Sequence, residues 1–303
     1  MTKLEGLGES ELLRRIMPYL TTTGYQVVAG EDDAAVWPSL DPDYPQDYVV
    51  ASCDSSVEGI HFDLSWMAPA DVGHRALALA LGDLAAKGAS PKYLLVALAA
   101  PRHWQLETVT GLYEGMHRLA DRYDMAIAGG DMTATDGPAV LSLTVFGTVA
   151  EVPLARSRVQ PGWAVAVSGP LGGAAVALRQ RRVFLPEPEF EEGTRLNQAE
   201  LCCGDVSDGL LREMEKFAAV SGIGCVIRSE DVPVAAGATI DDALTSGEES
   251  HLVCVGPEDK VIHAGLRPIG VMTSSAGVRV VGPDGADLQL PVRGYDHFAK
   301  TGH

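Results

Sequence analysis

The chain has 303 residues, of which 46% are hydrophobic and 21% charged, and its 23 basic and 41 acidic residues give a formal net charge of -18. This length predicts two domains of about 150 residues each, and the many Gly, Ala and Val residues favour an α/β fold with a small-residue core. The acidic excess would repel a phosphate backbone, so nucleic acid is not expected as a partner.

The cysteines and the N-terminus bear on the compartment. The five cysteines lack C-x-x-C spacing, and their odd number fits reduced thiols better than a disulfide framework. Acids stand near the N-terminus where a signal peptide needs an apolar core, and no run approaches about 18 uninterrupted apolar residues. We therefore expect a cytoplasmic protein with no membrane partner.

The first half of the chain alternates predicted helices and strands. Apolar residues at helical spacing predict a helix over Glu9 to Leu20, and a β-rich run predicts a strand over Asp47 to Asp54. An initial Pro and Asp and a terminal Lys-Gly predict a long helix over Pro69 to Gly88. A strand over 93–100, a helix over 106–123 and strands over 125–128 and 140–150 follow.

The sequence becomes polar and Arg-bearing near Pro153 to Gly162. This change predicts a boundary between an N-terminal domain, 1–150, and a C-terminal domain, 151–303. The second half then predicts a strand, a Gly turn and a helix over 165–180, a surface loop over the Pro- and Glu-rich run 181–193, and a turn and helix over 204–220.

Aspartates recur beside the predicted elements. Phosphoryl transfer from ATP requires cations, and Mg²⁺ prefers carboxylate oxygens from a few fixed residues. An Asp beside Gly is commonly a turn or cap residue, whereas Asp83 interrupts an apolar helix face, where an unpaired carboxylate is costly. The candidate metal-binding carboxylates are those of Asp32, Asp33, Asp54, Asp83, Asp131, Asp205 and Asp208.

The usual nucleotide signatures are missing from the sequence. Neither G-x-x-x-x-G-K-[ST] nor G-x-G-x-x-G occurs, which excludes the P-loop and protein-kinase classes. The Gly-rich run Gly169 to Gly173 lies between a predicted strand and a predicted helix. Its amides suit a phosphate, and close packing explains the glycines equally well.

A series of short motifs spans nearly the whole chain: EDDAAV, ASCD, EGIHF, LGDLAAKGASPKY, GGDMT, the ARS before QPGW, DVSDGL, SGEE and GYDHF. Their order resembles that of the thiamine-monophosphate kinase family. Its superfamily also contains aminoimidazole-ribotide synthetase, selenophosphate synthetase and a hydrogenase-maturation protein. The resemblance implies a homodimer that forms through the sheet of an N-terminal α/β domain, and an active site in the cleft between this domain and a C-terminal α/β domain.

The resemblance also implies roles for particular residues. Those implied as metal ligands are Asp33, Ser52, Cys53, Asp54, Asp83, Asp131, Asp205 and Asp208. Those implied to face the nucleotide are Tyr113, Gly130, Asp131, Arg156 and Ser207. The acceptor would contact His61, Glu248 and Tyr295. Read without the resemblance, His61 is better explained as a turn residue with a local hydrogen bond, and Tyr295 as a cover for the C-terminal core.

The implied reaction is ATP-dependent phosphorylation of thiamine monophosphate to thiamine diphosphate, by direct in-line transfer assisted by Mg²⁺. Arg156 would stabilise the developing charge. The acceptor phosphate is largely ionised near neutral pH, so no dedicated general base is expected, and none is evident in the sequence.

Five positions depart from the family pattern: Glu31 replaces a Gly, Cys53 and Met132 each replace a Thr, and Glu249-Ser250 replaces Asp-Tyr. Two alternatives therefore stay open. One is a related ATP-dependent enzyme with a different small-molecule acceptor. The other is a non-catalytic dimeric nucleotide-binding protein.

Overall fold

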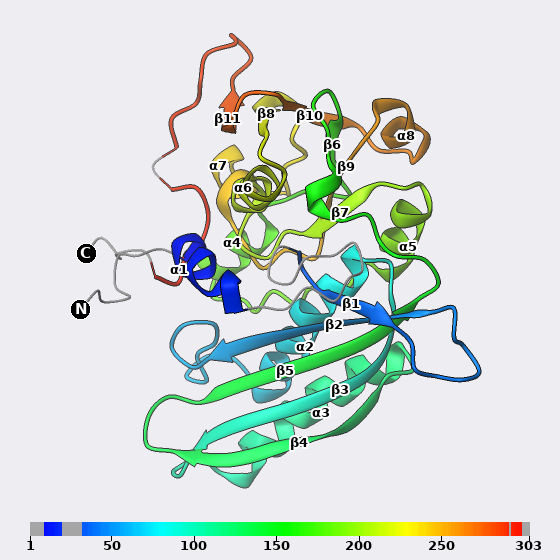
Figure 1. Ribbon diagram of the computed structural model, residues 1–303. Coiled ribbons are helices and arrows are strands. Elements are labelled where there is room, and N and C mark those ends of the chain that lie inside the picture. The colour runs from blue at the N-terminus through cyan, green and yellow to red at the C-terminus, as the bar shows by residue number, and fades with distance from the viewer. Residues whose placement is uncertain (1–8, 20–31, 291, 299–303) are drawn as a thin grey trace.

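The computed structural model describes residues 9–19, 32–290 and 292–298. It is a two-domain α/β fold with one sheet in each half of the chain (Figure 1). The helix α2 (Pro69–Ala86) contacts β2 and β5 of the N-terminal sheet and also β7 and α5 of the C-terminal half. No described helix has the length and apolar character needed to cross a membrane.

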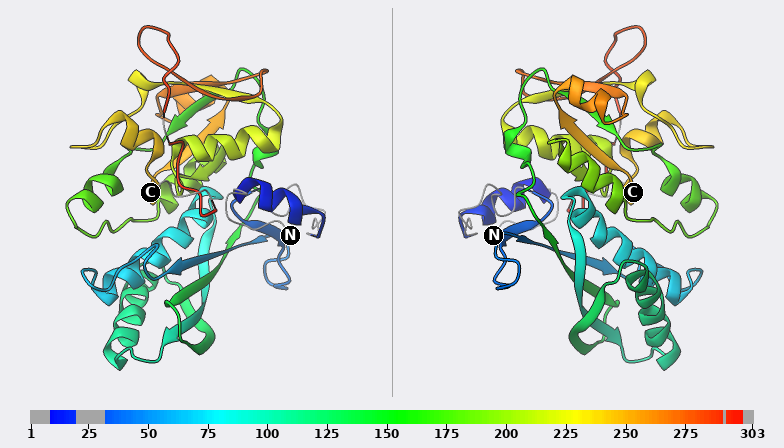
Figure 2. Two further views of the ribbon diagram at one scale, coloured as in Figure 1. Left: turned by 90° about the vertical axis from the view of Figure 1, so that its left-hand side faces the viewer. Right: turned by 90° about the vertical axis from the view of Figure 1, so that its right-hand side faces the viewer.

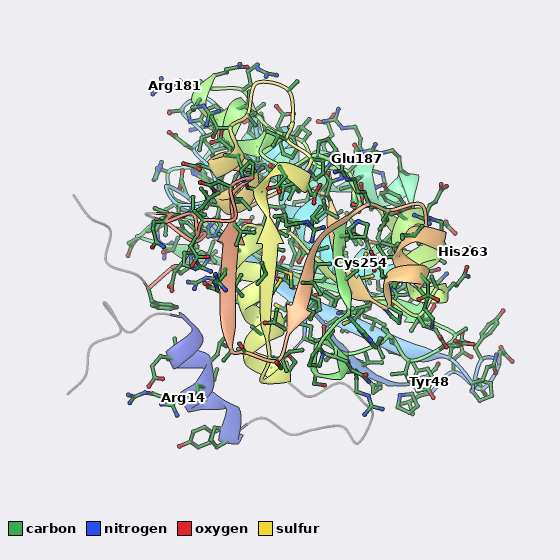
Figure 3. The ribbon with its side chains drawn as sticks, turned by 90° about the horizontal axis from the view of Figure 1, so that it is seen from above. Arg14, Tyr48, Arg181, Glu187, Cys254 and His263 are labelled. Carbon is green, nitrogen blue, oxygen red and sulfur yellow. The ribbon has the colours of Figure 1, made fainter. Side chains whose placement is uncertain are left out.

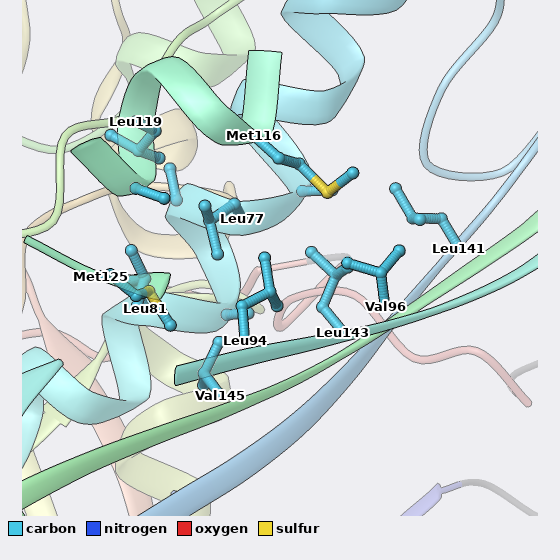
Figure 4. Packing of buried hydrophobic residues seen from close by; sticks show 14 of the residues in the cluster. Leu77, Leu81, Leu94, Val96, Met116, Leu119, Met125, Leu141, Leu143 and Val145 are labelled. Atoms are coloured by element: carbon cyan, nitrogen blue, oxygen red, sulfur yellow. The ribbon is translucent and has the colours of Figure 1, made fainter. Parts of the chain in front are cut away.

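The N-terminal sheet has five strands in the order β1-β2-β5-β3-β4, and only β3 and β4 run parallel. The strands are β1 (Ala35–Pro38), β2 (Tyr48–Val57), β3 (Ser90–Pro101), β4 (Ala126–Thr135) and β5 (Val140–Val149). Alternate residues of β3 such as Leu94 and Val96 are buried against α2 and α3 (Leu106–Arg122), as Figure 4 shows. This period of two is what a sheet covered on one face requires.

The other face of this sheet, over β5, β3 and β4, is covered by no described helix (Figure 2). Tyr93 and Leu95 alternate with the buried residues of β3 and are 56% and 39% exposed. The N-terminal sheet therefore presents an open face with large apolar side chains.

The C-terminal sheet has six strands in the order β11-β8-β10-β6-β9-β7. They are β6 (Ala164–Val167), β7 (Cys202–Asp205), β8 (Gly224–Arg228), β9 (Leu252–Gly256), β10 (Pro268–Thr273) and β11 (Gly277–Val281). Both faces are buried, because Val165 and Val167 join one apolar cluster while Ala164 and Ala166 join another. Figure 3 looks down on this sheet, with Cys254 in β9 and His263 in α8.

Helices flank the C-terminal sheet on both sides. They are α4 (Gly173–Arg179), α5 (Phe190–Gln198), α6 (Leu210–Ser221), α7 (Ile240–Thr245) and α8 (Glu258–His263). Short 3-10 helices cover Met17–Tyr19, Arg156–Arg158 and Ser229–Asp231. The α6 side chains Met214 and Phe217 pack in the apolar cluster that contains Val165 and Val167. Val261 of α8 packs in the cluster on the other face, which contains Ala164 and Ala166.

Most predicted elements are confirmed. The predicted helix over Glu9 to Leu20 is α1 (Glu9–Ile16) followed by the Met17–Tyr19 turn, and Leu20 lies outside the described residues. The predicted loop over 181–193 is wrong in its last part, because α5 begins at Phe190. Pro188 and the acids Glu191 and Glu192 are helix-start signals that the Pro- and Glu-rich composition concealed.

Candidate active site between the two sheets

Three aspartates meet where the two halves of the chain touch. Asp33 precedes β1, Asp83 lies within α2 and Asp205 ends β7, and one carboxylate oxygen of each lies within 4.8 Å of the others. Gly82 makes room for this approach, because a Cβ there would lie 2.8 Å from Asp205 Oδ2. We call Asp33, Asp83 and Asp205 the aspartate triad.

Two predicted metal ligands from β2 join the triad. The Ser52 hydroxyl donates to Asp83 Oδ2 at 2.5 Å. Burial raises the pKa of Asp54, and the neighbouring Asp208 and Asp33 carboxylates raise it further. Ser52 and Asp54 are two residues apart and therefore point to the same face of β2, the face that α2 covers.

The electrostatics of the triad are unfavourable without a further cation. Burial raises the pKa of Asp83 well above its usual value, and the Asp54, Asp205 and Asp33 carboxylates add to the shift. Burial likewise raises the pKa of Asp205, with Asp33 and Glu213 adding to it. No described Lys or Arg side chain lies within ion-pair distance of Asp54, Asp83 or Asp205, and the more distant Lys216 charge only partly offsets the raised pKa of Asp54 and Asp205.

Neighbouring acids do have side-chain cations. Lys87 pairs with Asp32 and Asp33, Arg156 pairs with Asp33 and Glu213, and Lys216 pairs with Asp208 and Glu213. Burial acts to raise the pKa of Asp33, but the Arg156 and Lys87 charges lower it overall. The site therefore has a compensated side, formed by these pairs, and an uncompensated side, formed by Asp54, Asp83 and Asp205.

The uncompensated side fits a divalent cation. Its donors are all carboxylate oxygens with a hydroxyl beside them, the set that Mg²⁺ prefers. Raised carboxylate pKa values from burial and mutual repulsion are what a bound divalent charge would reverse. The oxygens that could hold such an ion are those of Asp33, Asp83 and Asp205, with the Ser52 hydroxyl at Asp83 and the Asp54 carboxylate nearby.

The loop between β7 and α6 joins these carboxylates to a second cluster. Ser207 O accepts a hydrogen bond from Glu248 N at 2.7 Å, and Asp208 O accepts one from Tyr295 N at 3.0 Å. Gly247 permits the first contact, because a Cβ there would lie 2.1 Å from Ser207 O. The predicted metal loop therefore lies next to the segments that carry Glu248 and Tyr295.

The three predicted acceptor residues are brought together around Arg75 and His297. Arg75 forms an ion pair with Glu248, and its guanidinium donates to His61 O at 2.6 Å. The His297 ring lies 5.1 Å from the His61 ring and 4.7 Å from the Tyr295 ring, measured between centroids. Burial lowers the pKa of His61, and His297 lowers it further.

Hydrogen bonding assigns the His61 tautomer. Val57 N donates to His61 Nδ1 at 3.0 Å, so Nδ1 is the acceptor and Nε2 carries the proton. The local hydrogen bond expected for a turn residue is present, and it leaves an N–H donor on the other side of the ring. Tyr295 is 48% exposed, so its ring does not act only as a cover for the C-terminal core.

Other predicted residues are not brought to the triad within one chain. Cys53 points to the open face of the sheet, where its Sγ accepts a hydrogen bond from the Thr144 hydroxyl at 3.4 Å. Gly130 and Asp131 lie in β4, the edge strand farthest from β1. Tyr113 packs from α3 against the N-terminal core.

Arg156 is close to the triad but is enclosed. It is 3% exposed, and its guanidinium lies 5.4 Å from the centre of the Phe217 ring while it pairs with Asp33 and Glu213. The Arg156 guanidinium is therefore not exposed at the surface, where the predicted contact with a nucleotide would require it. Glu31, one of the departures from the family pattern, lies outside the described residues.

Sequence reasoning missed Lys87, Glu213, Lys216, Arg75 and His297. Lys87 stands four residues after Asp83, but this helical spacing predicts a pair between the two, whereas the Lys87 ammonium pairs with Asp32 and Asp33. The Gly-rich run 169–173 holds an internal carboxylate rather than a ligand. Glu249 Oε1 accepts hydrogen bonds from Gly172 N at 2.9 Å and Ala174 N at 3.1 Å.

Comparison with known proteins adds an independent line of observation. The family model described as AIR synthase related protein, N-terminal domain, matches residues 31–149. The chain is 35% identical over 254 residues to a thiamine-monophosphate kinase of Rhodopirellula baltica, covering 78% of this chain and 79% of that protein.

Two solved structures share the fold. AaThiL complexed with AMPPCP and TMP superposes with a TM-score of 0.80 at 25% identity, over 96% of this chain and 97% of that one. Thiamine-monophosphate kinase from Stenotrophomonas maltophilia gives a TM-score of 0.70 at 28% identity, over 92% and 96%.

Proposed function

The chain belongs to the thiamine-monophosphate kinase family, and from this premise we propose that it transfers the γ-phosphoryl group of ATP to thiamine monophosphate, giving thiamine diphosphate. The observation that carries the proposal is the 206–209 loop. Its Asp208 belongs to the carboxylate cluster, and its backbone carbonyls hold Glu248 and Tyr295. One loop thus places a metal-binding surface beside an acceptor-binding surface.

The acceptor side suits thiamine monophosphate chemically. The Glu248 carboxylate is negative and 35% exposed, and the Tyr295 ring is 48% exposed, so both can face a cationic thiazolium. The His61 Nε2–H is available to donate to an oxygen of the acceptor. The departure at Glu249 does not by itself favour another acceptor, because this side chain is 3% exposed and engaged with the first amides of α4.

On the phosphate side we propose that Asp33, Ser52, Asp54, Asp83, Asp205 and Asp208 hold Mg²⁺. Bound Mg²⁺ would supply the positive charge that a triphosphate needs for in-line transfer. The chain's own contribution is to place these donors where the two sheets meet and to pair Arg156 with Asp33 and Glu213. Transfer is direct, since the acceptor oxygen is itself an ionised nucleophile and needs no general base.

We further propose a cytoplasmic homodimer whose N-terminal (1–150) and C-terminal (151–303) domains enclose the site. The open face with the exposed side chains of Tyr93 and Leu95 supports association through the N-terminal sheet. In such a dimer Gly130, Asp131, Cys53 and Tyr113 would serve the nucleotide or the metal from surfaces that a single chain leaves apart from the triad. Five unpaired cysteine thiols support the cytoplasmic location.

The test is an acceptor panel with purified protein, ATP and Mg²⁺. Thiamine monophosphate, thiamine and no acceptor are compared, with ADP measured and the product identified by mass. Thiamine diphosphate formed only with thiamine monophosphate is the expected result. ADP release that is equal in all three mixtures would reject the proposed acceptor, and nucleotide binding without any turnover would favour a non-catalytic protein.

A further inference from the structure

Lys87 is a buried lysine, with 1% of its surface exposed. It is the C-cap residue of α2, where sequence alone explains it as a helix-ending cation. Its ammonium group instead points inward, where it pairs with Asp32 and lies 3.2 Å from Asp33 Oδ2. It also donates to Cys203 O at 2.8 Å.

These contacts reach every element that carries the aspartate triad. Asp83 lies one helical turn before Lys87 on α2, and Asp33 pairs with the ammonium directly. Cys203 stands two residues before Asp205 on β7. One side chain therefore links the segment before β1, the helix α2 and the strand β7, from both halves of the chain.

We propose that Lys87 is a positioning residue that holds the aspartate triad in the arrangement that binds metal. The inference rests on the metal site of the proposed function. A buried ammonium costs several kcal/mol to desolvate, and its contacts with Asp32, Asp33 and Cys203 O offset that cost only while the three elements keep their places. Loss of Lys87 removes its ion pairs to the segment before β1 and its hydrogen bond to β7, and leaves only packing contacts between α2 and β7.

The direction of the effect separates this role from two others. If Lys87 acted only as a like charge near the metal, its removal would tighten metal binding. If it served only stability, its removal would lower the melting temperature and leave metal affinity unchanged. A positioning role predicts weaker metal binding, because partners that orient metal ligands contribute about 10- to 100-fold in affinity.

The experiment is a calorimetric titration of the full-length, metal-free protein with Mn²⁺ in the absence of nucleotide. Lys87→Met is expected to raise the Mn²⁺ dissociation constant by about tenfold or more. Lys260→Met is the matched control, because Lys260 also forms an ion pair but is 37% exposed, and it is expected to bind Mn²⁺ as the wild type does.

A second variant covers the case in which Lys87→Met does not fold. Lys87→Arg keeps the charge but changes the donor geometry, and is expected to weaken Mn²⁺ binding by about threefold or more. Tighter or unchanged binding in a folded Lys87 variant overturns this inference alone. Absence of Mn²⁺ binding by the wild type overturns the proposed metal site, and this inference with it.

Discussion

Asp54 and Asp131 point to opposite faces of the same sheet. In the sheet register, Asp54 lies opposite Leu143 of β5, which lies opposite Val96 of β3, which lies opposite Gly130 of β4. The side chains of this row face α2 and α3. Asp131 follows Gly130, so its side chain belongs to the next row, on the open face. Within one chain only Asp54 lies beside the triad.

This separation predicts different phenotypes for two conservative variants. Asp54→Asn should weaken Mn²⁺ binding to the free protein by about tenfold or more, whereas Asp131→Asn should leave it unchanged. Both should lose turnover if Asp131 serves the nucleotide in the assembled enzyme. Equal loss of Mn²⁺ binding in both variants, measured by calorimetry, would contradict the placement of Asp131.

Metal-dependent stability should vary with pH. The pKa values of Asp83 and Asp205 are raised in the folded protein. Their contribution to the stability of the metal-free protein is therefore present at low pH and is lost as pH rises from the usual aspartate range through the raised values. Protons and metal compete for these oxygens, so the stabilisation by Mg²⁺ should grow as pH rises through the same window.

Thermal melting with and without Mg²⁺ across this pH range measures the effect. In the Asp83→Asn variant, the rise in melting temperature caused by Mg²⁺ should depend less on pH than in the wild type. Asp136→Asn, at a side chain that is 95% exposed, should leave it as in the wild type. A shift that does not depend on pH in the wild type would argue against protonated carboxylates in the metal-free site.

Arg75 is expected to govern binding of the acceptor. It holds both Glu248 and the His61 carbonyl, and a hydrogen bond to a charged group contributes about 1.5–3 kcal/mol. Arg75→Met should therefore lower kcat/KM for thiamine monophosphate by about 10- to 100-fold, with the KM for ATP little changed. Arg102→Met, at a surface ion pair, is the control. Steady-state kinetics with an equal rise in both KM values would contradict a role confined to the acceptor.

Glu249 is expected to matter for stability rather than for acceptor choice. Glu249→Ala leaves the Gly172 and Ala174 amides without their acceptor, and should lower the free energy of unfolding by about 1–3 kcal/mol. Glu230→Ala, at an exposed position, should change it by less than about 0.5 kcal/mol. Urea unfolding measures both. A stable Glu249→Ala variant that accepts a different substrate would reverse this assignment.

The sequence predicted most helices and strands of the first half and the three acids that the structure brings together, because periodicity and element-end acids are local signals. Asp83 was identifiable from a charge on an apolar helix face. The face on which Asp131 lies depends on strand register, including the irregularity between Leu94 and Leu95 in the β3 and β4 pairing, and this is not local. The inward turn of Lys87 depends on Asp32 and on the Cys203 carbonyl, which belong to distant segments.

The most direct test of the central claim follows the γ-phosphoryl group itself. ATP labelled in that group is incubated with the protein and thiamine monophosphate, with Mg²⁺ or with a chelator, and the products are separated. With Mg²⁺, the label is expected at the terminal phosphate of thiamine diphosphate. With the chelator, no labelled thiamine diphosphate is expected. Label released only as inorganic phosphate, or transfer that persists under chelation, would contradict the proposed transfer.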